Sequence, residues 1–284
     1  GAAADAVRAR DPIRHPHPST RLASVVAALT LWSPCSLQAQ AADRDPGGES
    51  APMVLQRMSG PVELDGVVDE PAWDAIEPLP MTMFSPFFGG EITERTEIRI
   101  GYDDTYLYVS GRLYDSDPDG IRTNTFVRDA YSGDDLLSVV IDSYDDRETA
   151  VWFSANPSGA RTDRSVANDA LFNGGTFPAN SDWNSHWDAA TSQTEEGWFA
   201  EFRIPFSTLG FQSIEGEARM GLIAYRFIAR KNERQLFPGI DPSWGEMAFA
   251  KPSQAQRVVI RDVEPSKPIY VTPYVLGGFD QVPA

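Results

Sequence analysis

The sequence predicts an all-β fold, a two-sheet antiparallel β-sandwich with little helix. Apolar, β-branched and aromatic residues occur in short runs separated by turn formers, and no long stretch shows the apolar period of an amphipathic helix. The chain has 284 residues, 42% of them apolar, with 15 Phe, 9 Tyr and 7 Trp, which is enough to fill a sizeable core.

Two strand-length runs form the centre of this pattern, at residues 136–141 and 149–155, with the acidic segment 142–148 between them. Strand formers bounded by turn formers predict an antiparallel hairpin in the middle of a sheet. Residues 96–114 predict a second hairpin, with its turn at Asp103 and Asp104 and one face exposed to water. Further strands are expected at residues 197–206, 219–230 and 257–262.

Residues 61–76 predict a short strand, a turn at Asp65-Gly66 and then one turn of helix from Pro71, since proline suits the first turn of a helix. Trp73 and Ile76 are three residues apart and are expected to pack on the sheet.

Four segments are expected along the chain. Residues 1–41 contain an upstream stretch and a signal peptide, because an apolar run at 22–32 precedes the small-residue cleavage pattern that ends at Ala41. A disordered alanine-rich tail is the alternative for this part. Residues 42–58 are expected to be a linker, 59–264 the sandwich, and 265–284 a hinge and the start of a truncated C-terminal region of β-barrel type.

Composition excludes several functions. The net charge is −17, so the surface repels phosphate backbones and nucleic acid is a poor partner. Cys35 lies in the expected signal peptide, so the mature chain has no disulfide, thiolate metal site or cysteine nucleophile, and His186 is its one histidine. No motif of serine or zinc hydrolases occurs.

Glycoside hydrolysis by paired carboxylates is the remaining catalytic alternative. The adjacent pairs at residues 134–135, 145–146 and 195–196 lie in expected turns, where solvated charge is the ordinary state. The sequence therefore favours a chain without catalysis of its own.

Several spaced motifs carry a resemblance to family 9 carbohydrate-binding modules. They are LDGVVDEPAW at 64–73, YDDTYLYVSGRLYDSD at 102–117, DDLLSVVID at 134–142 and GWFAEFRIPF at 197–206. FSANPSGARTD, the 183–187 segment, IPFSTLGF and RFIARKNE resemble more narrowly the N-terminal domain of bacterial outer-membrane proteins that end in a DUF5916-type barrel. The resemblance covers about residues 60–275.

The resemblance implies a jelly-roll-type sandwich that binds sugars by stacking aromatic rings on them. Trp244 stands where such modules carry one stacking tryptophan, and Tyr131 is the nearest candidate for the second ring. Two positions depart from the family pattern. Ser138 stands where sugar-binding members tend to carry Glu, and the following strand has Trp152-Phe153 where they have Arg.

The resemblance further implies a non-catalytic module exported to the periplasm or outer membrane of a Gram-negative bacterium. Such modules often accompany glycoside hydrolases, which would link the chain to polysaccharide breakdown. The alternative is a periplasmic plug or assembly domain that binds no saccharide and interacts with its own C-terminal β-barrel.

Two loops and one basic segment leave alternatives open. Asp115, Asp117 and Asp119 have the spacing of a calcium loop, but position twelve is Phe126 and not Glu, so an acidic turn is the favoured interpretation and calcium the alternative. Trp183 and Trp187 are either a ligand platform or a plug at one end of the sandwich. The arginines of residues 226–234 are expected to pair with internal carboxylates.

Overall fold

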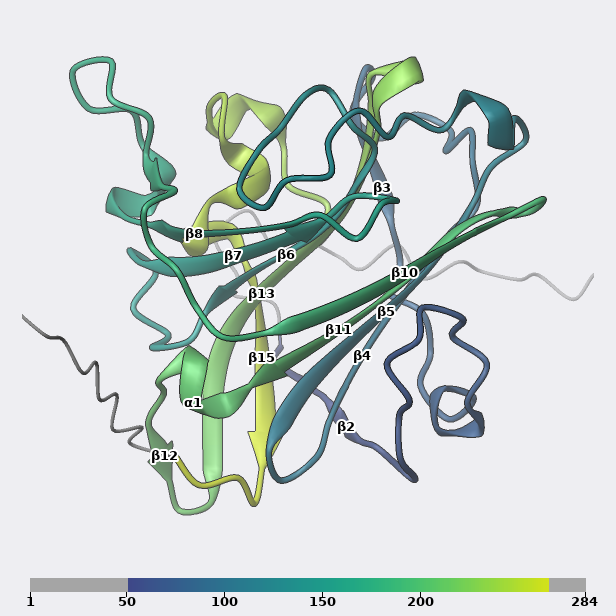
Figure 1. The fold of residues 1–284 in the computed structure, drawn as a ribbon. Coiled ribbons are helices and arrows are strands. Elements are labelled where there is room, and N and C mark those ends of the chain that lie inside the picture. The colour runs from purple at the N-terminus through teal and green to yellow at the C-terminus, as the bar shows by residue number, and fades with distance from the viewer. Residues whose placement is uncertain (1–50, 266–284) are drawn as a thin grey trace, which may run out of the picture. The chain divides into compact units, whose positions relative to one another are not determined.

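The computed structural model describes residues 51–265, and they form two β-sheets (Figure 1). In this part of the chain the larger sheet, sheet A, has the order β1-β15-β13-β6-β7-β8-β9, with β12 and β14 pairing with β13 and β3 pairing with β14. The smaller sheet, sheet B, has the order β10-β11-β5-β4-β2. The predicted all-β, two-sheet fold is confirmed.

The strands of sheet A are β1 (Met53–Val54), β3 (Thr82–Ser85), β6 (Leu136–Asp142), β7 (Ala150–Ala155), β8 (Arg161–Val166), β9 (Ala179–Asn180), β12 (Ser213–Ile214), β13 (Glu217–Ile228), β14 (Glu233–Phe237) and β15 (Gln256–Arg261). Those of sheet B are β2 (Gln56–Arg57), β4 (Thr96–Tyr102), β5 (Tyr106–Tyr114), β10 (Asp188–Thr194) and β11 (Gly197–Pro205). Between residues 51 and 265, helix is limited to α1 (Phe206–Leu209) and seven 3₁₀ turns: η1 (Pro71–Trp73), η2 (Pro118–Gly120), η3 (Asn168–Ala170), η4 (Ala229–Lys231), η5 (Pro242–Trp244), η6 (Ala248–Ala250) and η7 (Pro252–Gln254). Among the described residues, no helix has the length and apolarity needed to cross a membrane.

The predicted hairpins form as expected because their period-two patterns match the face that each sheet buries. Strands β6 and β7 pair in the interior of sheet A, and β4 pairs with β5 through a turn that contains Asp103 and Asp104. Alternate residues of both sheets meet in one core. Its fully buried members from sheet B include Ile98, Val109, Leu113, Trp198, Phe202 and Ile204, and those from sheet A include Leu137, Val139, Phe153 and Ala224.

The structure differs from the expected linker at residues 42–58. Strands β1 and β2 lie inside that range, and each pairs in parallel with one sheet, β1 with β15 and β2 with β4. Two-residue strands are too short to show a period of two, so the sequence pattern does not reveal them. No strand forms at residues 61–64.

The outer face of sheet B is covered and not exposed to water as expected. Val68, Trp73 and Ile76 pack there against Tyr108 and Phe199, and η1 places Trp73 as predicted. The cover buries β11 on both faces, so Glu201 is fully buried although its pattern predicts exposure.

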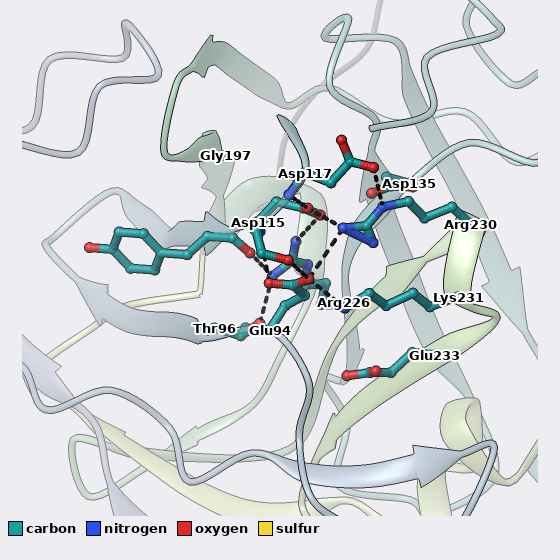
Figure 2. Close-up of polar contacts among 12 residues, drawn as sticks. Glu94, Thr96, Asp115, Asp117, Asp135, Gly197, Arg226, Arg230, Lys231 and Glu233 are labelled. Atoms are coloured by element: carbon teal, nitrogen blue, oxygen red, sulfur yellow. Dashed lines mark hydrogen bonds and ion pairs between the residues drawn. The ribbon is translucent and has the colours of Figure 1, made fainter. Parts of the chain in front are cut away.

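A buried guanidinium joins the two sheets. Arg226 on β13 donates from Nη1 to the carbonyl oxygens of Arg95 (3.2 Å) and Tyr114 (2.7 Å) and to Thr96 Oγ1 (3.1 Å) in sheet B (Figure 2). Its Nη2 lies 3.4 Å from Asp115 Oδ2. Burial lowers the pKa of Arg226 to about 10, so the group remains charged near neutral pH.

We expect Arg226→Leu to lower the free energy of unfolding by about 3–5 kcal/mol, because it leaves buried carbonyl groups without their donor and removes one of the two arginines paired with the buried Asp115 carboxylate. Arg219→Leu is the matched control, since Arg219 lies on the same strand with an exposed side chain. Urea denaturation followed by tryptophan fluorescence measures both. Equal losses in the two variants would contradict the cross-linking role.

Candidate functional site

The outer face of sheet A, which points away from sheet B, carries a row of paired polar and aromatic residues. Cross-strand register places Arg164 beside Trp152, Ser138 beside Tyr225, and Phe227 beside Arg234. Paired residues share a face, and Trp152 and Tyr225 belong to a core separate from the one between the sheets.

Three rings form the centre of this face. Trp152, Tyr225 and Phe249 meet edge to face, with centroid separations of 6.2, 6.0 and 5.5 Å. Phe249 comes from the segment that contains η5, η6 and η7, which packs on sheet A on this side (Figure 1). The segment thereby covers part of the face and fixes the orientation of the rings.

Two arginines lie on these rings. The guanidinium carbon of Arg164 is 5.2 Å from the centre of the Trp152 ring, and that of Arg234 is 3.8 Å from Phe249 and 5.3 Å from Tyr225. Cation–π attraction offsets part of the cost of desolvation. Burial lowers the pKa of Arg234, whereas the nearby Tyr225 and Tyr131 raise it.

Hydroxyl groups run across the same face. Ser138 Oγ and Ser154 Oγ are 2.7 Å apart, and Thr162 follows on β8 in register with Ser154. These three side chains are buried. Ser138, which stands where the family pattern expects Glu, is thus hydrogen-bonded to Ser154.

The two predicted stacking residues both lie on the outer side of sheet A. Trp244 ends η5 and is 52% exposed, and Tyr131 is 54% exposed in the loop before β6. Charge–charge interaction links Tyr131 with Arg234 and Arg164, and partial burial raises the pKa of Tyr131. The two rings therefore belong to segments that border the same face.

Trp183 and Trp187 lie elsewhere. Trp187 is 2% exposed, its ring meets Phe153 and Phe202 at 5.1 Å, and Nε1 donates to Asp163 at 3.3 Å. Trp183 packs on the inner side of Phe153 at 6.1 Å. This corrects the assignment of Trp187 to a sugar-binding platform, because a ring with both faces in the core has none to offer a ligand; the plug interpretation fits both residues.

Carboxylates of the acidic loop at residues 115–119 form ion pairs with arginine side chains. Asp115 pairs with Arg226 and Arg230, Asp117 lies 3.6 Å from Arg230, and Asp119 is exposed in η2 (Figure 2). The positive charge beside these carboxylates is thus supplied by guanidinium groups. In residues 51–265, no group of three or more His, Cys, Asp or Glu side chains is placed to hold a metal ion.

The prediction that the arginines of residues 226–234 pair with internal carboxylates is confirmed for Arg226 and Arg230 and is wrong for Arg234. Arg226 and Arg230 pair with Asp115, and Lys231 beside them pairs with Glu94. Arg234 points to the other face of sheet A and stacks on rings, because alternation along β14 reverses its side chain relative to Glu233 and Gln235.

Sequence reasoning missed Arg164, Arg234, Tyr225 and Phe249 as members of one site. They come from β8, β14, β13 and η6, and only strand order brings them together. The one available signal was the run RFIARKNER, which contains Arg234.

The sequence profile described as carbohydrate family 9 binding domain-like matches residues 64–258. This chain belongs to that family. The matched range begins in the cover of sheet B and ends on β15, so it spans nearly all of both sheets. Among proteins with curated descriptions, none matches the chain.

Solved structures resemble this family 9 domain in fold. One described as a putative carbohydrate-binding protein from Bacteroides uniformis is 13% identical, with a TM-score of 0.55, and the alignment covers 74% of this chain and 98% of that one. A family 9 module from Caldicellulosiruptor kristjanssonii in complex with cellotriose is 17% identical, with a TM-score of 0.49 over 78% of this chain and 100% of that one.

A buried carboxyl group of the family 9 domain, that of Glu201, lies on β11 of sheet B and so in the other sheet from these rings. Burial raises the pKa of Glu201 to about 7, and nearby Glu70 adds to the rise. N–H groups of Gly66 and Trp73 donate to its oxygens at 3.0 and 3.3 Å and oppose the rise. The fully buried side chain fits a structural role and not acid–base catalysis.

The folded-state pKa of Glu201 exceeds the ordinary 4.5, so the folded state binds the proton more tightly, and Glu201 makes stability fall as pH rises from about 4.5 to about 7. We expect Glu201→Gln to remove a fall on the order of 3 kcal/mol, since one pKa unit corresponds to about 1.4 kcal/mol. Urea unfolding at pH 4.5 and pH 8 measures this difference. Glu195→Gln, in an exposed turn, is the control, and a parallel pH dependence in Glu201→Gln and the parent would contradict the role.

Proposed function

We propose that this chain is a carbohydrate-binding domain that holds a saccharide on the outer face of sheet A. Two half-exposed rings of this family 9 domain support the proposal. Trp244 lies between Ile240 and Met247, which pack in the outer core of sheet A, and Tyr131 is close enough to Arg164 and Arg234 to interact electrostatically with them. The C–H face of a sugar ring is apolar and packs on an aromatic ring, while its hydroxyl rim needs fixed polar partners.

The polar partners on this face differ from those of the family pattern. In place of Glu and the strand Arg, the face presents Ser138 and Trp152. Arg164 and Arg234 supply the hydrogen-bond donors, from strands β8 and β14. We therefore assign stacking to Trp244 and Tyr131, and polar contacts to the two guanidinium groups.

A second candidate is the plug or assembly domain that binds another protein. It is supported by exposed apolar side chains on three loops, at Phe87, Phe126 and Val127, and Phe172, since solvent-exposed aromatic groups are typical of protein interaction surfaces.

The cellular setting remains a proposal that rests on the resemblance of the motifs. We propose that the domain is exported, is cut after Ala41, and precedes an outer-membrane barrel in a protein linked to polysaccharide breakdown. Residues 1–50 and 266–284, on which these assignments fall, lie outside the described residues. Expression of the full gene in a Gram-negative host should give a mature N-terminus at Ala42 in the envelope fraction, and recovery of the uncut chain in the cytosol would contradict export.

We expect Trp244→Ala and Tyr131→Ala each to weaken saccharide binding by up to about tenfold, because each removes one stacking ring worth about 0.5–1.5 kcal/mol. Affinity electrophoresis in gels that contain a panel of polysaccharides measures the loss. Tyr144→Ala is the matched control, since Tyr144 is 58% exposed in the turn at the other end of β6. Retention that is unchanged in both variants would remove the assignment, and retention by no member of the panel would favour the plug domain.

A further inference from the structure

Two arginines of the outer face have no acidic partner, although the chain carries 41 Asp and Glu residues against 24 Lys and Arg. Within residues 51–265, the guanidinium groups of Arg164 and Arg234 donate no hydrogen bond and pair with no carboxylate. Nε of Arg234 is buried without a partner. Their contacts are to rings: Arg164 to Trp152, and Arg234 to Phe249, Phe227 and Tyr225.

Most other arginines of the described part are neutralised. Arg226, Arg230, Arg257 and Arg128 each pair with a buried carboxylate, and Arg203 pairs with Asp188. A partly buried cation without a counter-ion is costly, because ring contacts replace only part of its lost hydration. The outer face therefore carries uncompensated positive charge in an acidic protein.

The carboxylates on either side of Tyr131 in the sequence do not pair with the two arginines, and Asp129 lies 3.3 Å from Arg128 Nε. Asp134 accepts the backbone N–H groups of Asn124, Thr125 and Ser132, and Asp135 accepts that of Ala229 at 2.9 Å. Both side chains are fully buried. Asp134 and Oδ1 of Asp135 accept from backbone N–H groups, and neither carboxylate pairs with Arg164 or Arg234.

Strand spacing sets the span of this charged face. Strand β8 is separated from β14 by β7, β6 and β13, so the backbones of Arg164 and Arg234 lie four strand spacings, or about 19 Å, apart across the sheet. Register also offsets them along the strands, since Arg164 is level with Ile223 of β13 and Arg234 with Phe227. The side chains converge on one aromatic group, since Trp152 and Tyr225 are in edge-to-face contact. An oligosaccharide with an acidic group on more than one sugar fits this spacing better than a single ring.

We propose that the saccharide bound on this face is acidic, and that Arg164 and Arg234 bind carboxylate groups of uronate residues. This inference rests on the proposed function and names its ligand class. A guanidinium offers a planar pair of N–H donors to a carboxylate, and the rings beneath it orient that pair toward the ligand. The acidic surface elsewhere on the chain repels such a ligand, so binding depends on this local charge.

The test is calorimetric titration of the full chain with matched trimers that differ only at C6: cellotriose against the β-1,4 glucuronate trimer, and β-1,4 mannotriose against the mannuronate trimer. We expect at least one acidic trimer to bind about tenfold more tightly than its neutral partner, which corresponds to about 1.4 kcal/mol. The preference should shrink in high salt because exposed charges are screened.

Arg234→Gln and Arg164→Gln should each reduce this preference toward unity. Arg164→Gln serves as the independent variant if the loss of Arg234 disturbs the aromatic cluster, and a thermal melt reports on folding of both. Arg219→Gln, an exposed arginine on β13, is the control and should keep the preference.

Each outcome decides between the proposals. Equal binding of acidic and neutral trimers would overturn the acidic ligand and leave the proposed carbohydrate binding intact. A preference that persists in both folded Gln variants would overturn the role of the two arginines. Binding of none of the trimers, or of the polysaccharide panel, would overturn the proposed function and the inference that rests on it.

Discussion

The buried Arg226 guanidinium is the constraint on which the arrangement of the two sheets depends. It is carried by β13 of sheet A, yet its donors end on backbone oxygens and a carboxylate of sheet B. Apolar packing between sheets has little directional preference, whereas this set of hydrogen bonds fixes one register of β13 against β4 and β5. Arg230 and Lys231 extend the network to Glu94, whose pKa is raised by burial but brought below its usual value by hydrogen bonds from Lys231 and Ser116.

The same strands present different chemistry on their two faces. On the inner side of the β13–β14 pair, positive charge is neutralised by Asp115 and Glu94. On the outer side, Arg234 lies on Phe249 and Phe227 and is not paired with an acid. The inner guanidinium groups are therefore neutralised within the domain, whereas those of Arg164 and Arg234 on the outer side have no carboxylate partner among residues 51–265.

The segments that pack on the outer faces of the two sheets differ in how much of each face they cover. Residues 61–76 lie over sheet B and bury Glu201, so that face is closed. The segment that contains η5 and η6 covers sheet A only in part and leaves Trp244 half exposed at its edge. The outer face of sheet A is therefore less completely covered than that of sheet B.

The sequence by itself determined the two-sheet fold, the main hairpins and the burial of Trp73, because alternation of apolar residues is a local property that each strand carries on its own. It also indicated that Arg226 and Arg230 pair with acids. It placed Trp187 among the binding candidates and residues 53–57 in a linker, since neither burial at a sandwich end nor a two-residue strand leaves a periodic signal. Only the tertiary structure joined Arg164, Arg234 and the Trp152–Tyr225–Phe249 rings, because strand order and not sequence spacing decides which side chains share a face.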